Sequence, residues 1–413
     1  MLRVIFLCLA GVVFFFGSGV AEFPISYMIV VALVFITSDI LERKHSPYLA
    51  PVLLVSSSTL VAILLAEIGL RVGWDDRLFY RSHDRFFERS TEFRDSHRYV
   101  PSVQSTRRIH GDLAAFSGAP SDRVYRMERF ITDGRGFRNA NRDSSEKVNV
   151  IVLGDSFAAG SDTTQEETWT QVMRDELKMR VYNLGLPGSP ADELRVPVTE
   201  LPHLSVAENP IVVWMIFSGN DFEPPYESSE LLSDPSALKM GLLESLIVTL
   251  YNSQSRSALS RLFGSIKRVE GTPLVERRTI PGVGQMLFYR PYIEMATRNR
   301  HEIEGSLAYA SLRRTMRKMR QFSQASRFSV LVVAAPSKED VYLRTYMEGE
   351  KTAVAQVLEG LSQEVSFDFL DLGPLFVKSA KERALWWSDD THWNSDGNRV
   401  AAEAIAARLR SER

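Results

Sequence analysis

The sequence has a single cysteine, Cys8, among its 413 residues. An intramolecular disulfide and a zinc site made of several cysteines are therefore excluded. An excess of one charge is also lacking, because 49 basic residues are balanced by 51 acidic ones, which gives a net charge of −2. This balance argues against a nucleic-acid-binding protein, which normally carries many more basic than acidic residues. With 45% hydrophobic residues, the composition also excludes a disordered chain.

Hydrophobic residues are concentrated near the amino terminus, where long segments contain no charged residue. A bilayer core about 30 Å thick requires about 20 residues of helix. We therefore predict three membrane-spanning helices, at about residues 4–21, 23–41 and 46–66, within a membrane region that covers residues 1–73. An alternative for the first segment is a signal peptide that is cleaved after Ala21.

The short loops between these helices predict how the chain is oriented in the membrane. The first loop contains Glu22 and no basic residue, whereas the second contains Arg43 and Lys44. Basic loops stay on the cytoplasmic side. We therefore expect a multi-pass membrane protein whose remaining chain lies outside the cytoplasm, which for a bacterial inner membrane is the periplasmic or extracellular side. The lipid bilayer is then a predicted partner, together with other membrane proteins of a polysaccharide pathway.

Beyond the membrane region, the sequence divides into a polar part and a regular part. Residues 74–145 are predicted to be a connector that packs on the following domain, with solvated charged faces. In residues 146–413, apolar runs alternate with helical patterns, which predicts an α/β fold with a parallel sheet covered on both faces. The predicted strands are 148–153, 180–184, 210–217, 327–335 and 367–372, and the predicted helices are 168–177, 191–200, 303–325 and 396–410. Residues 224–300 interrupt this alternation as a partly helical insertion.

Small and polar residues follow the predicted strands. Ser156 comes after the first strand, Gly188 lies in the loop after the second, and Asn220 follows the third. His392 stands just before the last helix, after the adjacent Asp389 and Asp390. In parallel sheets the active groups lie at the carboxyl ends of the strands, so we expect these residues to lie close together.

These residue types suit acyl transfer. A serine becomes a nucleophile when a histidine takes its proton, and the histidine requires a carboxylate that orients it and stabilises its cation. Ser156, His392 and one of the two aspartates can fill these roles. The tetrahedral intermediate requires hydrogen-bond donors directed at its oxygen. The backbone N–H groups of Ser156 and Gly188 and the side-chain amide of Asn220 are the candidates.

The same segments resemble the sequence blocks of the SGNH, or GDSL-type, hydrolases. Gly154-Asp155-Ser156 resembles the nucleophile block, Gly188 the glycine block, Asn220 the asparagine block, and His392 with its nearby aspartates the last block. The resemblance implies a three-layer α/β/α sandwich with a parallel five-stranded sheet of flavodoxin-like type. It also implies the chemistry of an esterase or an O-acyltransferase that uses no cofactor and no metal.

Two features depart from the usual family pattern. Ser218 stands where the third block usually has a glycine, although Asn220 can still serve. The triad acid is ambiguous, because the commoner family spacing indicates Asp389. The string Asp390-Thr391-His392-Trp393 indicates Asp390 instead, and it is similar to that of proteins that acetylate bacterial exopolysaccharides such as alginate. We favour Asp390.

Several residues near the motifs have a structural alternative. Trp387 and Trp393 are candidate substrate-binding residues, because aromatic faces stack on sugar rings, and the alternative, which we favour, is buried packing. Asp155 is expected to fix the turn at Ser156. Asp389, Asp390 and His392 could bind a metal, but no fourth ligand is evident in the sequence.

The main functional hypothesis is a membrane-anchored, outward-facing enzyme that acts on an ester, in particular an O-acetyl ester, of a cell-envelope or secreted glycan. One alternative is a lipase or lysophospholipase at the membrane surface, which an apolar lid within residues 239–252 would favour. Another is a non-catalytic assembly factor of a polysaccharide export system. The presence of Ser156, Asn220 and His392 argues against that last function.

Overall fold

The computed structural model describes most of the chain beyond residue 79. The described residues are 58, 62, 80–93, 96–140, 147–222, 239–242, 244, 245, 248, 252, 274–343 and 351–411. The predicted membrane helices therefore lie outside the described residues, apart from two helical positions, 58 and 62. Within the described residues, no helix has the length and apolar character needed to cross a bilayer.

The chain divides into two compact units. One comprises residues 1–78, 89–94 and 239–270, and few of its residues are described. The other comprises residues 79–88, 95–238 and 271–413, and it contains the predicted α/β fold. The site described below and the sheet and helices around it belong to this second unit.

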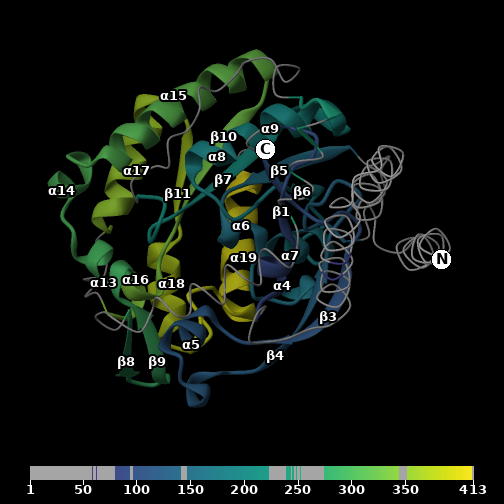
Figure 1. Ribbon diagram of the computed structural model, residues 1–413. Coiled ribbons are helices and arrows are strands. Elements are labelled where there is room, and N and C mark those ends of the chain that lie inside the picture. The colour runs from purple at the N-terminus through teal and green to yellow at the C-terminus, as the bar shows by residue number, and fades with distance from the viewer. Residues whose placement is uncertain are drawn as a thin grey trace, which may run out of the picture. The chain divides into compact units, whose positions relative to one another are not determined.

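A parallel five-stranded sheet forms the centre of this unit (Figure 1). Its strands are β5 (Val148–Leu153), β6 (Val181–Asn183), β7 (Val206–Phe217), β10 (Ser329–Ala335) and β11 (Asp368–Asp371). They stand in the order β11-β10-β7-β5-β6. Numbered along the chain, this is the 2-1-3-4-5 order of flavodoxin-like sheets, in which the strand order reverses between the first and third strands, here β5 and β7.

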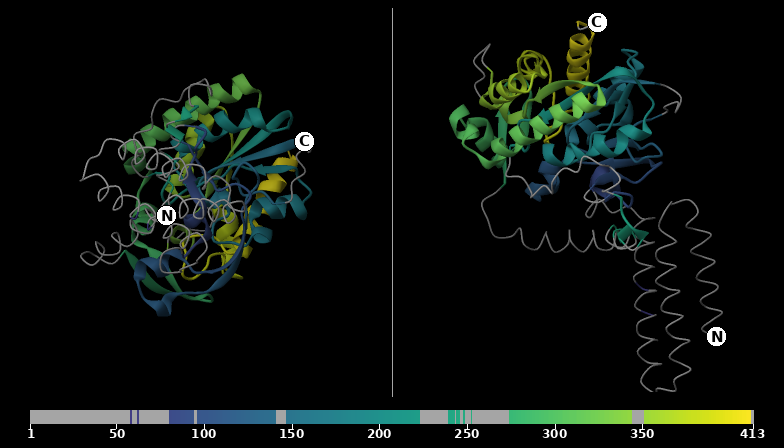
Figure 2. Two further views of the ribbon diagram at one scale, coloured as in Figure 1. Left: turned by 45° about the vertical axis from the view of Figure 1, so that its right-hand side comes forward. Right: turned by 90° about the horizontal axis from the view of Figure 1, so that it is seen from above.

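Helices cover both faces of the sheet, which makes a three-layer sandwich (Figures 1 and 2). Two clusters of buried hydrophobic side chains fill the space between the layers. Strand β5 shows the alternation, because Ile151 and Leu153 belong to one core cluster and Val150 and Val152 to the other. Side chains of successive strand residues point to opposite faces, so a strand buried on both sides has an apolar residue at nearly every position.

The helices that contribute to the two clusters come from different parts of the chain. The first cluster includes residues of α9 (Arg195–Glu200), α15 (Leu307–Ser326) and α17 (Ala353–Glu364). The second includes residues of α7 (Trp169–Asp175), α18 (Gly373–Ala380) and α19 (Ser395–Ser411). The shorter helices are α6 (Ser156–Ala159), η2 (Gln165–Glu167), α8 (Pro190–Glu193), η3 (Leu201–His203), α14 (Arg300–Glu304) and α16 (Lys338–Tyr342).

The described part of the predicted connector contains regular structure. Its elements are α4 (Ser82–Phe86), β1 (Phe87–Arg89), β2 (His97–Tyr99), β3 (Gln104–Ile109), α5 (Asp112–Ser117), η1 (Pro120–Asp122) and β4 (Arg126–Ile131). Strands β3 and β4 pair antiparallel over their whole length. This hairpin carries Arg126, whose side chain reaches the site described below.

The insertion after β7 differs from its prediction in part. Its described end contains α13 (Arg290–Thr297), as expected of a partly helical segment. It also contains an antiparallel hairpin of β8 (Val275–Ile280) and β9 (Gly284–Tyr289), which the sequence analysis missed. Strand β8 is mostly exposed and carries charged residues, so it lacks the apolar run that identifies a buried strand.

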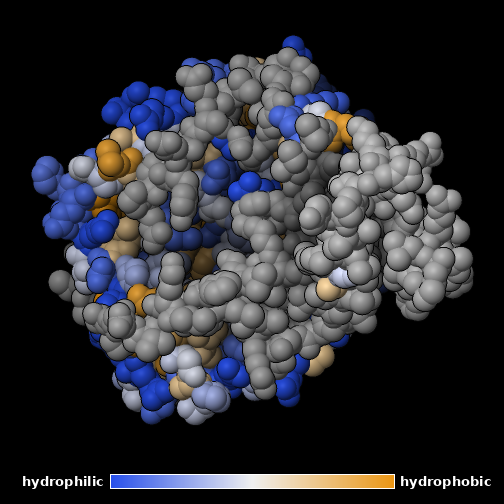
Figure 3. All heavy atoms as spheres, viewed as in Figure 1, coloured by the Kyte–Doolittle hydropathy of each residue, from blue (hydrophilic) through white to orange (hydrophobic). Residues whose placement is uncertain are grey.

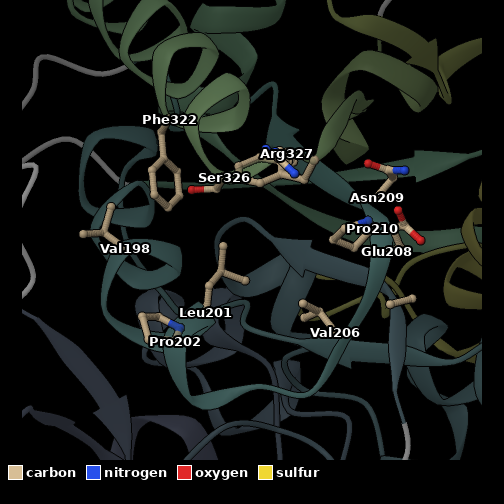
Figure 4. A pocket seen from close by; sticks show the side chains of 12 residues that line it. Val198, Leu201, Pro202, Val206, Glu208, Asn209, Pro210, Phe322, Ser326 and Arg327 are labelled. Carbon is tan, nitrogen blue, oxygen red and sulfur yellow. The ribbon is translucent and has the colours of Figure 1, made fainter.

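A pocket of about 550 Å³ lies where β7 begins (Figure 4). Phe322, Ser326 and Arg327 line it at the end of α15, and Val206 and Pro210 line it on the strand. The predicted active groups follow the carboxyl ends of the strands instead. This pocket is therefore separate from the candidate site.

Candidate active site

Strand β5 leads directly into the turn that presents Ser156. Gly154 has a φ of 139°, and a Cβ at this position would lie 2.6 Å from the carbonyl oxygen of Met215, so glycine is required there. Asp155 then caps helix α6, because its carboxylate accepts a hydrogen bond from Phe157 N at 2.9 Å. This agrees with the turn-fixing role expected of Asp155, and it places the half-buried Ser156 in the first turn of α6.

His392 lies between a hydroxyl and a carboxylate. Its Nε2 is 2.8 Å from Oγ of Ser156, and its Nδ1 is 2.9 Å from Oδ1 of Asp390. The same carboxylate oxygen accepts a hydrogen bond from the backbone N–H of His392 at 3.0 Å. A carboxylate at Nδ1 favours the tautomer with the proton on that nitrogen. The lone pair of Nε2 then faces the serine hydroxyl, as removal of its proton requires.

Asp389, the other candidate acid, is bound elsewhere. Its Oδ2 accepts hydrogen bonds from Gly111 N at 2.7 Å and Val124 N at 2.9 Å. A Cβ at Gly111 would lie 1.9 Å from the carbonyl oxygen of Asp389, so only glycine permits this approach. The structure therefore brings Asp390 to His392, whereas Asp389 holds the connector against the loop that carries the histidine.

The connector contributes buried charges to the site. The guanidinium of Arg126 on β4 donates to Asp390, and it lies 3.3 Å from Oδ1 of Asp389. Asp112, at the start of α5, accepts hydrogen bonds from the backbone N–H and the hydroxyl of Thr391, at 2.9 and 2.6 Å. The interpretation of the connector's charges as solvated faces is wrong for Arg126, whose side chain is 8% exposed. It is paired with carboxylates, which is the condition under which a charge can be buried.

Asp162 is a site residue that the sequence patterns did not identify. Its Oδ2 lies 2.9 Å from Nδ1 of His392, and its side chain is fully buried. The only sequence signal is its place in the polar run Ser161-Asp162-Thr163-Thr164, shortly after the nucleophile turn. No sequence pattern identified Arg126, because it lies on a strand that is remote in the sequence from the catalytic motifs.

The charges around Asp390 keep it ionised. Burial alone would raise its pKa, but the guanidinium of Arg126 and the hydrogen bond with His392 hold the pKa of Asp390 well below its usual range. Burial and the nearby charge of Asp390 raise the pKa of Asp112 to about 6. At neutral pH, Asp390 is thus a carboxylate that can stabilise a positively charged His392.

We expect Arg126→Met to destabilise the protein strongly. Removing one partner of a buried ion pair leaves an uncompensated charge and costs about 3–5 kcal/mol of the free energy of unfolding. The matched control is Arg129→Met on the same strand, because the pair of Arg129 with Glu166 is about half exposed on both sides. Such surface pairs contribute about 0–1 kcal/mol. Urea unfolding of the two variants would contradict this account if their losses were equal.

The candidate oxyanion donors lie on loops that follow three neighbouring strands. The loop after β6 is fixed to the nucleophile turn, because Leu186 N donates to the carbonyl oxygen of Gly154 at 3.0 Å. Gly188, further along this loop, is exposed and shares a small hollow with Gly154. Asn220 follows β7 and is half-buried, and within the described residues its Oδ1 has no hydrogen-bond partner.

Ser218 and Asn183 hold these loops in place. Oγ of Ser218 accepts a hydrogen bond from Ser337 N at 2.9 Å, which joins the end of β7 to the end of β10. A serine in place of the family's usual glycine thus has a structural use here. Asn183 donates to the carbonyl oxygen of Ala158 at 3.0 Å and accepts a hydrogen bond from Gly185 N at 2.8 Å. It connects α6 to the glycine-containing loop.

The two predicted stacking tryptophans differ in exposure. Trp393 is 2% exposed, and its ring packs on those of Phe157 and Phe376. The candidate role of Trp393 in stacking on a sugar is therefore wrong, because its ring is packed in the core, as the alternative predicts. Trp387 is half-buried, and the guanidinium of Arg126 lies 4.5 Å from its ring centre.

Asp112, Asp390 and His392 have ligand atoms within 4.8 Å of one another, which raises the question of a metal. Each carboxylate is already paired with an arginine, Asp112 with Arg81 at 3.3 Å and Asp390 with Arg126. The nitrogens of His392 face Ser156 and Asp390. These partners use the atoms that a metal would require, so the cluster suits a hydrogen-bonded triad better than a cation.

The sequence that contains these site residues identifies the protein family. A sequence model of the GDSL-like Lipase/Acylhydrolase family matches residues 152–400. The chain belongs to this family. The matched range contains Ser156, Gly188, Asn220, Asp390 and His392, and membership makes the chain a hydrolase of the esterase type. Among curated proteins, none matches the chain.

Several solved structures are similar to the chain at low sequence identity. An acetylxylan esterase from Geobacillus stearothermophilus is 13% identical, with a TM-score of 0.32, over 65% of this chain and 95% of that one. The esterase EstA from Pseudoalteromonas sp. is 12% identical, with a TM-score of 0.32, over 63% and 98%. A lipolytic G-D-S-L protein from Veillonella parvula is 12% identical, with a TM-score of 0.33, over 63% and 97%.

Proposed function

We propose that this GDSL-family protein is a serine esterase or O-acyltransferase in which Ser156 is the nucleophile, His392 the base and Asp390 the orienting acid. The observation that carries the proposal is the position of His392, 2.8 Å from the Ser156 hydroxyl and 2.9 Å from the Asp390 carboxylate. Hydrogen bonds on both ring nitrogens meet the geometric requirement for general-base activation of a serine.

In the proposed reaction, Oγ of Ser156 forms a bond to the carbonyl carbon of the ester while its proton moves to Nε2 of His392. The carbonyl oxygen becomes an oxyanion that accepts hydrogen bonds from Ser156 N–H, Gly188 N–H and the Asn220 amide. Collapse of this intermediate breaks the ester C–O bond, and the proton on His392 passes to the departing alcohol. Water or a sugar hydroxyl then takes the acyl group from Ser156, with His392 as the base again.

The proposed substrate is an O-acetyl ester of a cell-envelope or secreted glycan. Its support is the string Asp390-Thr391-His392-Trp393, which is similar to that of proteins that acetylate bacterial exopolysaccharides. The half-buried Trp387 is proposed to contact the sugar, since Trp393 is in the core. The two activities differ only in the acyl acceptor, which is water for an esterase and a sugar hydroxyl for a transferase. The proposal includes both activities.

An assay of ester substrates tests the substrate class. The full chain in detergent micelles would be incubated with an aryl acetate, with or without an unacetylated oligosaccharide as acyl acceptor, with an O-acetylated oligosaccharide, or with a lysophospholipid. Released acetate, newly acetylated sugar and released fatty acid would be quantified. We expect turnover of the acetyl esters that is lost in Ser156→Ala. Release of fatty acid without turnover of acetyl esters would favour the lipase alternative, and turnover of none of them would favour an assembly factor.

The lipase alternative has little support in the described residues. The exposed large hydrophobic residues there are Val124, Tyr125, Met127, Leu242, Leu274, Leu307 and Leu375, and they come from several separate segments. On the face in Figure 3, hydrophobic side chains of the described residues are scattered among hydrophilic ones. Most of the apolar segment 239–252 lies outside the described residues.

The proposed location is the inner membrane, with the catalytic domain on the periplasmic side. Its support is the uncharged segments before residue 67 and the basic loop Arg43-Lys44. We expect a phosphatase that is active only outside the cytoplasm to be active when fused after Arg413 and inactive when fused after Lys44. The reverse pattern of alkaline phosphatase activity in intact cells would overturn this orientation.

A further inference from the structure

Two carboxylates, rather than one, face Nδ1 of His392. Oδ1 of Asp390 and Oδ2 of Asp162 each lie 2.9 Å from this nitrogen. One N–H donates one well-aligned hydrogen bond, and the alignment favours Asp390. Both oxygens of Asp162 lack a hydrogen-bond partner within the described residues. Asp162 therefore contacts His392 chiefly as a buried charge.

A buried carboxylate without hydrogen bonds is unfavourable unless cations lie close to it. The nearest arginine nitrogen, on Arg81, is 3.6 Å from Oδ2 of Asp162, and Nδ1 of His83 is 3.8 Å from Oδ1. Burial and the charge of Arg81 lower the pKa of His83 to about 4, so His83 is neutral at physiological pH. When His392 is protonated, its ring is thus the cation closest to Asp162.

We propose that Asp162 is a second carboxylate partner of His392 and stabilises, together with Asp390, the imidazolium that forms when Ser156 attacks the ester. This inference rests on the proposed function. Asp162 touches neither Ser156 nor the reacting atoms, so it is a positioning residue. In the step that it assists, the Ser156 proton moves to Nε2, the Nδ1 proton stays hydrogen-bonded to Asp390, and the new positive charge faces both carboxylates.

The arrangement predicts a specific dependence on pH. Burial alone would lower the pKa of His392, but the two carboxylates of Asp162 and Asp390, each close to Nδ1, raise it to about 10. Attack requires neutral His392, so kcat/KM of the wild type should still rise with pH above neutrality. Loss of one carboxylate lowers the pKa of His392 and moves this rise to lower pH.

Replacing Asp162 leaves the other charged and titratable groups around the His392 ring in place. They are Arg81 and His83 near α4, Asp112 on α5, Arg126 on β4, Asp155 and Ser156 at α6, and Asp390. Among these, His83 is close enough for an edge contact, with ring centres 6.1 Å apart.

Asp162→Asn in the full chain is the test. Asn keeps the size of the side chain and tolerates the left-handed φ of 61° at this position. We expect the ratio of kcat/KM at about pH 8 to kcat/KM at about pH 10, with an aryl acetate, to rise about fivefold over the wild type, which is the change that an about tenfold weaker proton affinity of His392 produces when the wild-type pKa is about 10. The matched control is Asp133→Asn, because Asp133 fixes a turn by accepting hydrogen bonds from Arg135 N and Phe137 N. It should leave the ratio unchanged.

An unchanged ratio in Asp162→Asn would overturn the proposal, because a purely structural role would lower activity equally at both pH values. If the Asn variant does not fold, Asp162→Gly keeps the positive φ and should give the same shift. The pKa of His392 would also be followed by NMR of ¹⁵N-labelled histidine in a Ser156→Ala background. This readout needs no turnover, so it tests Asp162 even if the proposed reaction is wrong.

Discussion

Ser156→Ala is expected to lower kcat for an aryl acetate by a factor of roughly 10³ or more, and His392→Ala by a similar factor. Serine and histidine act as one unit, so the loss of either removes the activated nucleophile. The 2.8 Å contact between Nε2 and Oγ is the structural basis of this expectation. The double variant should lose little more than either single variant.

A control variant at another serine distinguishes a loss of catalysis from a loss of folding. Ser306→Ala removes the cap of α15, since Oγ of Ser306 accepts a hydrogen bond from Tyr309 N at 3.1 Å. It should cost about 1 kcal/mol of stability and leave kcat unchanged, because Ser306 is not part of the site. Wild-type turnover in Ser156→Ala would contradict the nucleophile assignment. An equal loss in Ser306→Ala would show that turnover follows folding instead.

Asp390→Asn should have the second largest effect. Asn keeps the shape, but its amide can donate to Nδ1 and favour the tautomer that cannot accept the serine proton. The equivalent change in a serine protease costs about 10⁴-fold in kcat. We expect a smaller loss, roughly 10²–10³-fold, because the carboxylate of Asp162 remains 2.9 Å from Nδ1.

Asp389→Asn is the natural comparison for this variant. Asp389 binds Gly111 N, Val124 N and Arg126 and makes no contact with His392, so its replacement should change kcat by less than about tenfold. Steady-state assays of both variants with the aryl acetate decide between the two acids. The opposite ranking would transfer the orienting role to Asp389. Small and equal losses would mean that neither acid orients His392.

Much of the fold could be predicted from local patterns. Strand β5 coincides with the predicted run 148–153, because both its faces are buried and every hydrophobic position contributes to the pattern. The predicted helix 303–325 is in fact two helices, α14 and α15, which are separated by Gly305 and Ser306. Ser306 caps the second one, and a capping serine inside an amphipathic pattern is easily missed.

The sequence predicted those site residues that lie in a recognisable motif at the end of a predicted strand or before the last predicted helix. Ser156, Asn220 and His392 stand at strand ends or before the last helix, which the alternation of elements reveals. The choice of Asp390 over Asp389 depends on which carboxylate turns towards the ring, and contacts with Gly111 and Arg126 decide that. Asp162, Arg126 and Asp112 reach the site through tertiary packing of segments remote from the histidine. Sequence spacing does not encode that packing.

The central claim is that Ser156 carries the acyl group during turnover, and trapping this intermediate tests it most directly. The full chain would be mixed with an aryl acetate, quenched in acid within the first turnovers, digested, and examined by peptide mass spectrometry. The account predicts one added acetyl group on the peptide that contains Ser156, and no such adduct in Ser156→Ala. An adduct on another residue, or turnover with an adduct that persists in Ser156→Ala, would contradict it.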